Sequence, residues 1–452
     1  MKYHFISIGG AVMHNMALAL HNLGHTITGS DDEIFEPAKG RLANVGLLPN
    51  EIGWFANKVH AGLDGVILGM HARANNPELL KAQKLGLPIY SFPQFLYEHA
   101  KEKTRVVIGG SHGKTTSTAM LMHVLRECKK DFDYMVGSQL AGFDTMVKLS
   151  NAPLIILEGD EYLTSPLDLR PKFHLYHPQL AMLTGIAWDH INVFPTFENY
   201  IEQFEIFINQ LPGGAPLAYY EGDEHLQTLV AKQKDRLKLL PYKELENKPI
   251  DADGYKTLIQ TDIGPVGLKI FGKHNLQNMA GIYLLAKELG IEDLEFYQAI
   301  STFEGTAKRL EVLYDNDAEK QTTVYRDFAH SPSKLKATVS AVREQYPNRK
   351  LTACFELHTY SSLNKDFLKE YVGSMDVADD IIIYYNAHSF EIKKMEPLQK
   401  AAVQKAFGAK AKVFDQTDDL KNFLEQLEYN NRVLLLMSSG SFDAITFNFW
   451  EK

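Results

Sequence analysis

Residues 105–128, RVVIGGSHGKTTSTAMLMHVLREC, combine a predicted strand, a glycine-rich turn and a helical pattern. Such a turn can curl its backbone N–H groups around a phosphate, while a lysine offsets the outer phosphates and a Ser or Thr hydroxyl binds Mg²⁺. The following helix adds the positive end of its dipole. The predicted loop consists of Gly110, Ser111, His112, Gly113, Lys114, Thr115 and Thr116. A complete motif would have glycine at Ile108, but the flanking strand and helix favour the triphosphate of ATP over a chance turn.

Acidic residues follow a second predicted strand, in APLIILEGDEY, and another strand leads into LAMLTGIAWDHINVF. Because ligands gather where parallel strands end, we expect Glu158, Asp160, Asp189 and His190 at one edge of a sheet. Mg²⁺ prefers oxygen ligands, so Glu158 is predicted to hold a metal between the γ-phosphate and an attacking carboxylate. His190 alone is a weaker indication of a metal site, because a single histidine beside an aspartate is more often structural.

The composition limits the function classes. The chain has 452 residues, 45% hydrophobic and 23% charged, which suits roughly two to four globular domains. A net charge of −9 argues against a nucleic-acid partner, which needs a basic face. Only Cys128 and Cys354 are present, which predicts a reducing, cytoplasmic setting. The N-terminal stretch lacks the apolar core of a signal peptide, and no apolar run of about 18 residues predicts a membrane span.

Short β-branched strands alternate with helical patterns along the chain, which predicts an α/β fold with parallel sheets covered by helices. We expect three domains: a Rossmann-like N-terminal domain over residues 1–103, a P-loop ATPase-like central domain over 104–309 and a Rossmann-like C-terminal domain over 310–452. Within the central region, ELENKPIDADGYKTLIQTDIGPVGLKIFG predicts short antiparallel strands.

Several motifs follow one another in a fixed order: GSHGKTT, EGDEY, WDHINVF, GKHNLQN, TAKRLE and DFAHSPSK. In this order and spacing the chain resembles the Mur ligase family, the ATP-dependent amide-forming enzymes of peptidoglycan synthesis. The resemblance implies that the first domain binds a UDP-sugar, the middle one ATP and the third the incoming amine. It also implies that the carboxylate of the UDP-linked substrate is phosphorylated, and that the amine attacks this acyl phosphate to give an amide, ADP and phosphate.

The resemblance also implies individual roles. Lys114 contacts the β- and γ-phosphates, Thr115 binds Mg²⁺, and Glu158 and His190 match the family's metal-binding pair, so that Lys114, Glu158 and His190 form the expected catalytic set. The remaining positions expected near the nucleotide are Thr116 in the loop, His274, Asn275 and Asn278 near the adenine, Arg309 at the domain boundary, and Asp327 and His330 after domain closure. Taken alone, KHNLQN also fits a helix start capped by Asn, and Asp327 an ordinary loop acid.

The UDP-sugar side carries fewer signals. The turn SIGGAVMHNMA keeps Gly10, Asp31 ends the next predicted strand, and MHARANNPELL, with Asn76, resembles the family's uracil-side loop. His14 and Asn15 stand where small residues are usual in the family, and their bulk could alter how the pyrophosphate is seated.

A second departure from the family lies in RDFAHS, where Arg326 replaces a common Asp. The hypothesis for this position is an extra cation that pairs with phosphate or with a substrate carboxylate.

Two amine substrates fit the resemblance. DEYLTSPLDLRPKFHLYHPQ and MSSGSFDAI favour the members that join UDP-N-acetylmuramate to the tripeptide L-alanyl-γ-D-glutamyl-meso-diaminopimelate in peptidoglycan recycling. The alternative is L-alanine, because His358 in FELHTYSS, an expected substrate-binding residue, resembles the members that add it. We expect small-molecule substrates, and a monomer or homodimer.

Three other classes remain as rivals: a related ligase for another acid, a mechanical P-loop ATPase and a non-catalytic UDP-sugar-binding protein. The region of about 100 residues before the phosphate loop argues against a folate-type ligase. The HNxxN helix argues against a mechanical ATPase, and Lys114, Thr115 and Glu158 together argue against binding alone.

Overall fold

The computed structural model describes residues 1–70, 72–188, 193–252, 254–316, 320–447 and 449–451. The chain forms two compact units, one made of Met1–Lys243 and Gln277–Ile300, the other of Glu244–Leu276 and Ser301–Lys452. It passes from one unit to the other at 243/244, 276/277 and 300/301. The domain boundaries expected at 103/104 and 309/310 stay predictions.

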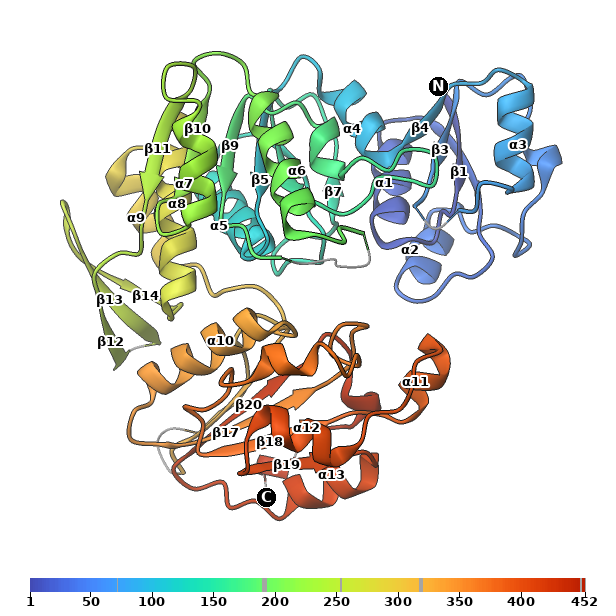
Figure 1. Cartoon of the computed structure of the whole chain (residues 1–452). Helices are drawn as coiled ribbons and strands as arrows, with labels where there is room; N and C mark the ends of the chain where they lie inside the picture. Colours follow the sequence, from blue (N-terminus) through green and yellow to red (C-terminus); the bar gives the residue numbers. More distant parts are fainter. Residues whose placement is uncertain (71, 189–192, 253, 317–319, 448, 452) are drawn as a thin grey trace. The chain divides into compact units, whose positions relative to one another are not determined.

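The first sheet of the first unit has the strand order β2-β1-β3-β4, and all its neighbouring strands are parallel (Figure 1). Its strands are β1 Lys2–Ile6, β2 Thr26–Ser30, β3 Gly65–Leu68 and β4 Ile89–Ser91, and its helices are α1 Ala11–Asn22, α2 Ala38–Asn44, the 3₁₀ turn η1 Ala56–Lys58, α3 Pro77–Lys84 and α4 Phe92–Ala100. Helix α4 begins with a capping box, in which Ser91 and Gln94 satisfy each other's backbone N–H groups. The predicted Rossmann-like alternation is confirmed.

The central sheet of the first unit has the order β11-β10-β9-β5-β8-β6-β7, parallel except for the edge strand β7. Its strands are β5 Thr104–Gly109, β6 Asp133–Met135, β7 Val147–Lys148, β8 Leu154–Gly159, β9 Leu180–Leu183, β10 Pro216–Tyr220 and β11 Lys238–Tyr242. Its helices are α5 Lys114–Glu127, the 3₁₀ turn η2 Lys172–Leu175, α6 Phe197–Asn209, α7 Glu224–Ala231, α8 Lys273–Glu288 and α9 Asp293–Ser301. Strands β5 and β8 are near-continuous apolar runs because both faces of the sheet are covered by helices.

The second unit contains a small antiparallel sheet and a larger sheet. The small sheet, β12 Asn247–Ala252, β13 Tyr255–Thr261 and β14 Gly264–Leu268, confirms the short antiparallel strands predicted here. The larger sheet has the order β15-β16-β20-β17-β18-β19 and is parallel apart from β15. Its strands are β15 Glu311–Asn316, β16 Thr322–Asp327, β17 Lys350–Glu356, β18 Asp380–Tyr384, β19 Ala411–Phe414 and β20 Arg432–Met437. Its helical segments are α10 Pro332–Gln345, η3 Leu368–Tyr371, α11 His388–Lys393, α12 Lys400–Phe407, α13 Thr417–Glu425, η4 Phe442–Ala444 and η5 Phe449–Glu451.

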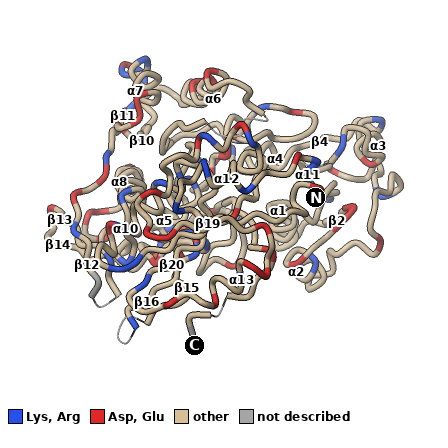
Figure 2. Tube along the Cα trace, turned by 60° about the horizontal axis from the view of Figure 1, so that its bottom comes forward, with Lys and Arg blue, Asp and Glu red and all other residues tan. Residues whose placement is uncertain are grey.

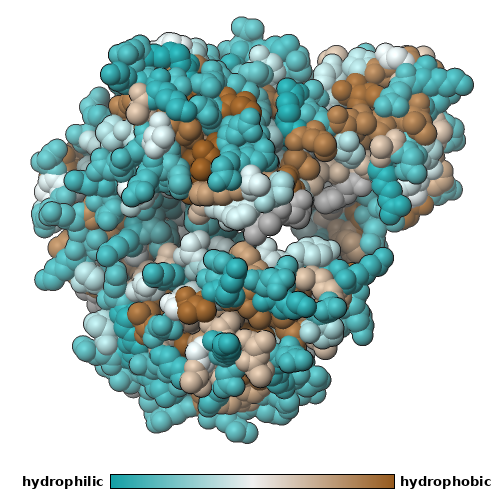
Figure 3. All heavy atoms as spheres, viewed as in Figure 1, coloured by the Kyte–Doolittle hydropathy of each residue, from teal (hydrophilic) through white to brown (hydrophobic). Residues whose placement is uncertain are grey.

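The apolar side chains are gathered between sheets and helices, and the face drawn in Figure 3 is mostly hydrophilic with separate apolar patches. Lys and Arg are interspersed with Asp and Glu along the trace (Figure 2), so that the net negative charge is not confined to one element. Among the described residues, no helix has the length and apolar character needed to cross a membrane.

Candidate functional site

The loop between β5 and α5 has the strand–turn–helix form that its sequence predicts. Gly110 and Gly113 have φ values of 125° and 81°, a region that side chains with a Cβ rarely adopt. A Cβ on Gly110 would overlap the Thr184 side chain, and one on Gly113 would lie 2.5 Å from Oδ1 of Asn278. Both glycines are therefore required by backbone conformation and by close neighbours, as in a turn built to approach an anion.

Lys114 places its ammonium at the centre of this loop. Its Nζ donates to the carbonyl oxygen of Gly110 at 2.7 Å and lies 2.6 Å from Oε2 of Glu161, which is fully buried. Burial lowers the pKa of Lys114, but the carboxylates of Glu161, Asp160 and Glu158 outweigh that effect and raise it. The lysine is therefore a charged group held at the centre of the loop.

Thr115 and Glu158, two of the predicted metal ligands, lie side by side. Thr115 Oγ1 donates to Oε1 of Glu158 at 2.7 Å, and the backbone N–H of Gly137 donates to Oε2 at 2.8 Å. Burial raises the pKa of Glu158, against the effect of these hydrogen bonds and of Lys114. A hydroxyl and a carboxylate are oxygen donors of the kind Mg²⁺ prefers, so the pair fits the predicted ion.

His190, the third predicted metal ligand, lies outside the described residues. Among the residues that are described, no three His, Cys, Asp or Glu side chains form a metal-binding group. The case for the metal rests on Thr115 and Glu158.

The structure adds Glu161, Lys172 and Tyr200, which the sequence did not single out as site residues. Oδ2 of Asp160 accepts a hydrogen bond from Nζ of Lys172 at 2.5 Å. The Tyr200 hydroxyl donates to Oε1 of Glu161 at 3.2 Å. The hydroxyl oxygens of Ser111 and Tyr200 lie 2.8 Å apart. EGDEY displayed Asp160 and Glu161 as acids, but no pattern in the sequence marks Tyr200, which reaches the loop from α6.

The predicted adenine-side residues of α8 belong to different units. Asn278 lies beside Gly113 in the first unit. Asn275, in the second, donates its side-chain amide to the carbonyl oxygen of Phe271 at 2.8 Å. Burial lowers the pKa of His274, Asp327 opposes this shift and Arg309 adds to it. Asn275 thus has a hydrogen-bond partner one turn earlier in the chain, and Asn278 lies against the glycine turn.

The other predicted residues of the second unit lie around the end of β16. The guanidinium of Arg309 lies over the ring of Phe328, 4.8 Å from its centroid. Asp327 accepts from the N–H groups of Leu310 and Ala329 at 2.8 and 2.7 Å, and thus fixes its own loop. His330 Nδ1 donates to the carbonyl oxygen of Phe328 at 2.9 Å.

Two further residues of this unit have clear partners. Arg326 pairs with Glu311 on the neighbouring strand: Nη2 donates to Oε1 at 3.0 Å and to Oε2 at 2.8 Å, and Nε donates to Oε2 at 3.2 Å. The cation proposed for phosphate or substrate is therefore already paired within the sheet. His358 follows the end of β17, with Nδ1 3.9 Å from Glu356, and its side chain is 40% exposed.

On the first sheet, Gly10 and Asp31 lie at the carboxyl ends of β1 and β2. Asp31 accepts from Gly9 N–H at 2.7 Å and from Asp32 N–H at 3.0 Å, and burial raises its pKa to about 6. Asn76 caps α3, because its Oδ1 accepts from the N–H of Glu78 at 2.9 Å and of Leu79 at 3.2 Å.

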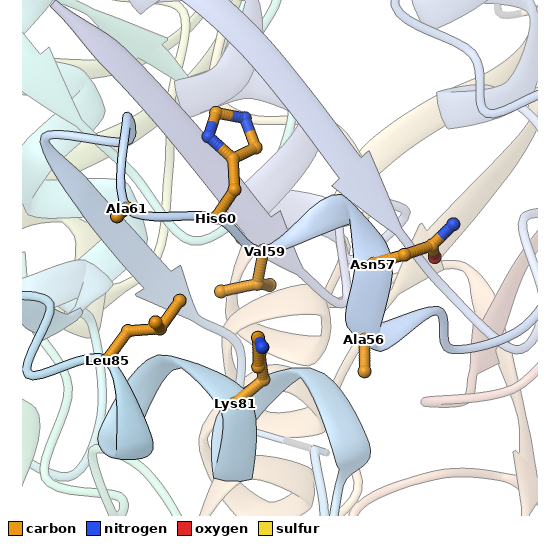
Figure 4. Close-up of a pocket in the computed structure, with 7 residues that line it drawn as sticks. All are labelled: Ala56, Asn57, Val59, His60, Ala61, Lys81 and Leu85. Atoms are coloured by element: carbon orange, nitrogen blue, oxygen red, sulfur yellow. The ribbon is translucent and has the colours of Figure 1, made fainter.

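A separate hollow lies on the first sheet and is drawn in Figure 4. It is lined by Ala56, Asn57, Val59, His60, Ala61, Lys81 and Leu85. Val59 to Ala61 precede β3 and Leu85 precedes β4, so the hollow lies toward the amino ends of these strands. Gly10 and Asp31 follow the carboxyl ends, and the hollow is therefore not part of the candidate site.

Comparisons with known proteins cover nearly the whole chain. Three family models match it in order: "Mur ligase family, catalytic domain" over residues 2–104, "Mur ligase middle domain" over 108–286 and "Mur ligase, glutamate ligase domain" over 308–440. The chain is 29% identical to the UDP-N-acetylmuramate–L-alanine ligase of Sulfurihydrogenibium sp. (strain YO3AOP1), with 98% of this chain and 96% of the relative covered. It is 25% identical, with the same coverage, to the UDP-N-acetylmuramate–L-alanyl-γ-D-glutamyl-meso-2,6-diaminoheptandioate ligase of Escherichia coli (strain K12).

Two solved structures share the fold over 98% of this chain and 97% of their own. One is the UDP-N-acetylmuramate–alanine ligase of Thermotoga maritima, with a TM-score of 0.73 at 21% identity. The other is a murein peptide ligase from Psychrobacter arcticus 273-4, with a TM-score of 0.65 at 23% identity. The predicted α/β class is confirmed by this likeness to three-domain ligases.

Proposed function

Since this chain belongs to the Mur ligase family, and is therefore an ATP-dependent carbon–nitrogen ligase, we propose that it joins the carboxylate of UDP-N-acetylmuramate to the α-amine of L-alanine. The observation that carries the proposal is the cluster of Lys114, Thr115 and Glu158 where β5 and β8 end. Cytoplasmic peptidoglycan synthesis is the proposed setting.

The amine differs from the one that the sequence favoured. The tripeptide was preferred, with L-alanine as the alternative, but the L-alanine ligase relative is the more similar of the two, at 29% against 25% identity. L-alanine is therefore the first candidate. Both amines present the same reacting group, the α-amine of an L-alanyl residue, so the choice depends on what accommodates the rest of the peptide.

One observation keeps the tripeptide as the second candidate. The stretch that resembled tripeptide ligases folds into an ordered arm, in which Leu163 bridges to Pro171 and the Thr164 hydroxyl donates to the carbonyl oxygen of Arg170 at 2.7 Å. The arm follows the acids of β8 directly, and its Leu169 is 67% exposed. An exposed arm next to the acids is suited to supporting a longer amine.

In the proposed reaction, the loop N–H groups and Lys114 would hold the phosphates, and Thr115 and Glu158 would hold Mg²⁺. When bound, Mg²⁺ would offset the negative charge that builds up as carboxylate and phosphates meet. Lys114 contributes in the same way, because its side chain is only 14% exposed and is already oriented by the carbonyl oxygen of Gly110. Phosphorylation turns the carboxylate, a poor electrophile, into an acyl phosphate that the amine can attack.

The test is phosphate release from ATP with Mg²⁺ and UDP-N-acetylmuramate, with L-alanine or the tripeptide added. Release that depends on L-alanine supports the proposal. Release with the tripeptide alone would replace it by the second candidate. Absence of release with either amine, in a folded sample that still binds ATP, would overturn UDP-N-acetylmuramate as the acid.

A further inference from the structure

Helix α1 of the first sheet packs against β7 of the central sheet (Figure 1). One apolar core runs through this junction, since Met16 and Leu20 of α1 belong to the same cluster as Val147 of β7. Burying a polar side chain in an apolar core costs free energy unless each of its donors and acceptors has a hydrogen-bond partner. A polar side chain at this junction is therefore expected to have a complete set of partners.

Asn15 is that polar side chain, and all four of its hydrogen-bonding positions are used. Its side-chain amide donates to the carbonyl oxygen of Ala11 at 2.8 Å and to Nε2 of His14 at 3.0 Å. Its Oδ1 accepts from Arg41 at 3.3 Å and from the backbone N–H of Met146 at 3.1 Å. The side chain is fully buried, and its orientation is fixed by these partners.

His14 continues the chain of hydrogen bonds to the glycine turn of the first sheet. Nδ1 lies 2.9 Å from the carbonyl oxygen of Gly10, and because a carbonyl only accepts, Nδ1 carries the hydrogen. Nε2 is then free of hydrogen and accepts from Asn15. Burial lowers the pKa of His14, in agreement with a neutral ring.

On the other side, the loop of residues 137–146 connects the junction to the candidate site. At its start, the Gly137 N–H donates to Glu158 at 2.8 Å. In its middle, Gln139 accepts from Arg41 at 3.1 Å, and the carbonyl oxygen of Gly142 accepts from Arg126 of α5 at 2.8 Å. At its end, Met146 donates to Asn15. The loop is therefore held by both sheets and by the helix that begins at Lys114.

We propose that Asn15 and Arg41 are positioning residues, which fix the 137–146 loop, and with it Glu158, relative to the glycine turn at Gly10. This inference rests on the proposed function, because that reaction needs the acid substrate, held at the first sheet, to present its carboxylate beside Glu158. His14 and Asn15, which depart from the small residues usual in the family, thereby acquire a role at the junction. A displacement of about 1 Å between reacting groups can cost on the order of a hundredfold in rate.

The experiment compares Asn15→Leu and Arg41→Met with matched controls on the same helices, Asn22→Leu on α1 and Lys39→Met on α2. Both control positions are exposed. For each protein, kcat, the KM for ATP, the KM for UDP-N-acetylmuramate and the melting temperature are measured. Exchange of the backbone amides of residues 137–146 with deuterium is followed in the same samples. Arg41→Lys serves as the conservative variant, since it keeps a cation but not the fork that reaches two partners.

For the two test variants we expect kcat to fall about ten- to a hundredfold, with the KM for ATP changed less than about twofold because Lys114 is not touched. Amide exchange in the loop should become faster, and Arg41→Lys should lie between Arg41→Met and the wild type. Should Asn15→Leu fail to fold, Arg41→Met, at a partly exposed position, carries the test.

The proposal is overturned if Arg41→Met is folded, keeps kcat within twofold of the wild type and leaves the loop's amide exchange unchanged. Lower melting temperature with unchanged kcat would also overturn it, since that is the behaviour of a purely structural contact. Amide exchange distinguishes failure of this inference from failure of the proposed function. A wild-type protein without ligase activity would contradict the proposed reaction. Faster amide exchange of residues 137–146 in the Arg41→Met variant would still support the role of Arg41 in fixing that loop.

Discussion

The ammonium of Lys114 lies in a buried cluster of carboxylates, and these raise its pKa although burial alone would lower it. The cluster therefore holds a cation whose charge is balanced before any phosphate arrives. In the proposed reaction, an incoming phosphate would share or replace Glu161 as the partner of this cation. Such preorganised charge is the effect that contributes most to catalysis at sites of this kind.

Replacing Lys114 by Met keeps most of the side-chain volume and removes the charge. We expect kcat for amide formation to fall by about a hundredfold or more, because the variant loses the cation that lies beside Gly110 and Glu161 in the loop. Steady-state kinetics measure this effect. Lys130→Met, at an exposed position after α5, is the control and should leave kcat unchanged. A Lys114→Met protein that keeps half its kcat would contradict the role.

Among the elements, α5 depends on a glycine at its start. Gly113 has a positive φ and lies against Asn278, whereas Gly24, at the end of α1, has a similar φ of 83° and no atom within 4 Å of a built Cβ. The two positions thus separate the cost of backbone strain from the cost of a steric clash.

We expect Gly24→Ala to lower the free energy of unfolding by about 1–2 kcal/mol, the cost of the left-handed conformation. Gly113→Ala should cost roughly 1–3 kcal/mol more, because Asn278 must move, and it should also weaken nucleotide binding. Urea unfolding and nucleotide titration provide the measurements. Equal destabilisation by the two substitutions would show that the contact with Asn278 is unimportant.

A second element-scale contact ties the start of β5 to β6. Asp133 is fully buried and accepts from Lys103 at 2.5 Å and from the backbone N–H of Ser150 at 3.0 Å. Burial by itself would raise the pKa of Asp133, but the nearby His99, at 3.8 Å, and the hydrogen bonds from Lys103 and Ser150 outweigh it and lower the value to about 2. A depressed pKa favours the folded state above the ordinary pKa of 3.8, and that gain is lost as the pH falls through about 2.

The stability difference between the wild type and Asp133→Asn should therefore shrink as the pH is lowered from 5 toward 2. The full effect is about 2 kcal/mol. Urea unfolding at several pH values in this window measures it, and Asp131→Asn, at an exposed neighbouring position, is the control. A difference that stays constant across the window would mean that Asp133 has an ordinary pKa in the folded protein.

At the scale of the whole molecule, the residues that the family resemblance assigns to one nucleotide belong to both units: Lys114 and Asn278 to the first, Arg309, Asp327 and His330 to the second. An acyl phosphate must be protected from water, and closure of domains is the usual way to achieve this. We expect the radius of gyration in solution to decrease when a non-hydrolysable ATP analogue and UDP-N-acetylmuramate are added together. A scattering profile that does not change would contradict closure.

The sequence by itself determined the strand–turn–helix form of the glycine-rich loop, the acids at the end of β8, the alternation of strands and helices and the family, because each depends on residues adjacent in the chain or on the order of motifs. It favoured the tripeptide over L-alanine, and here the comparisons support the alternative better. The division of residues 274–278 between two units, and the connection of Asn15 to the loop that holds Glu158, were not visible in any local pattern.

Only the tertiary structure decided which distant side chains share a partner. Strand β5 lies between β8 and β9, so the loop after it meets Glu161, which follows β8, and Thr184, which follows β9. The same folding pairs Arg326 with Glu311, where the sequence suggested a cation available to substrate. A sequence motif indicates the chemistry that a short segment can support. The side chains that contact this segment, and so set its charge and position, are determined by strand order and helix packing, which cannot be read from a short segment.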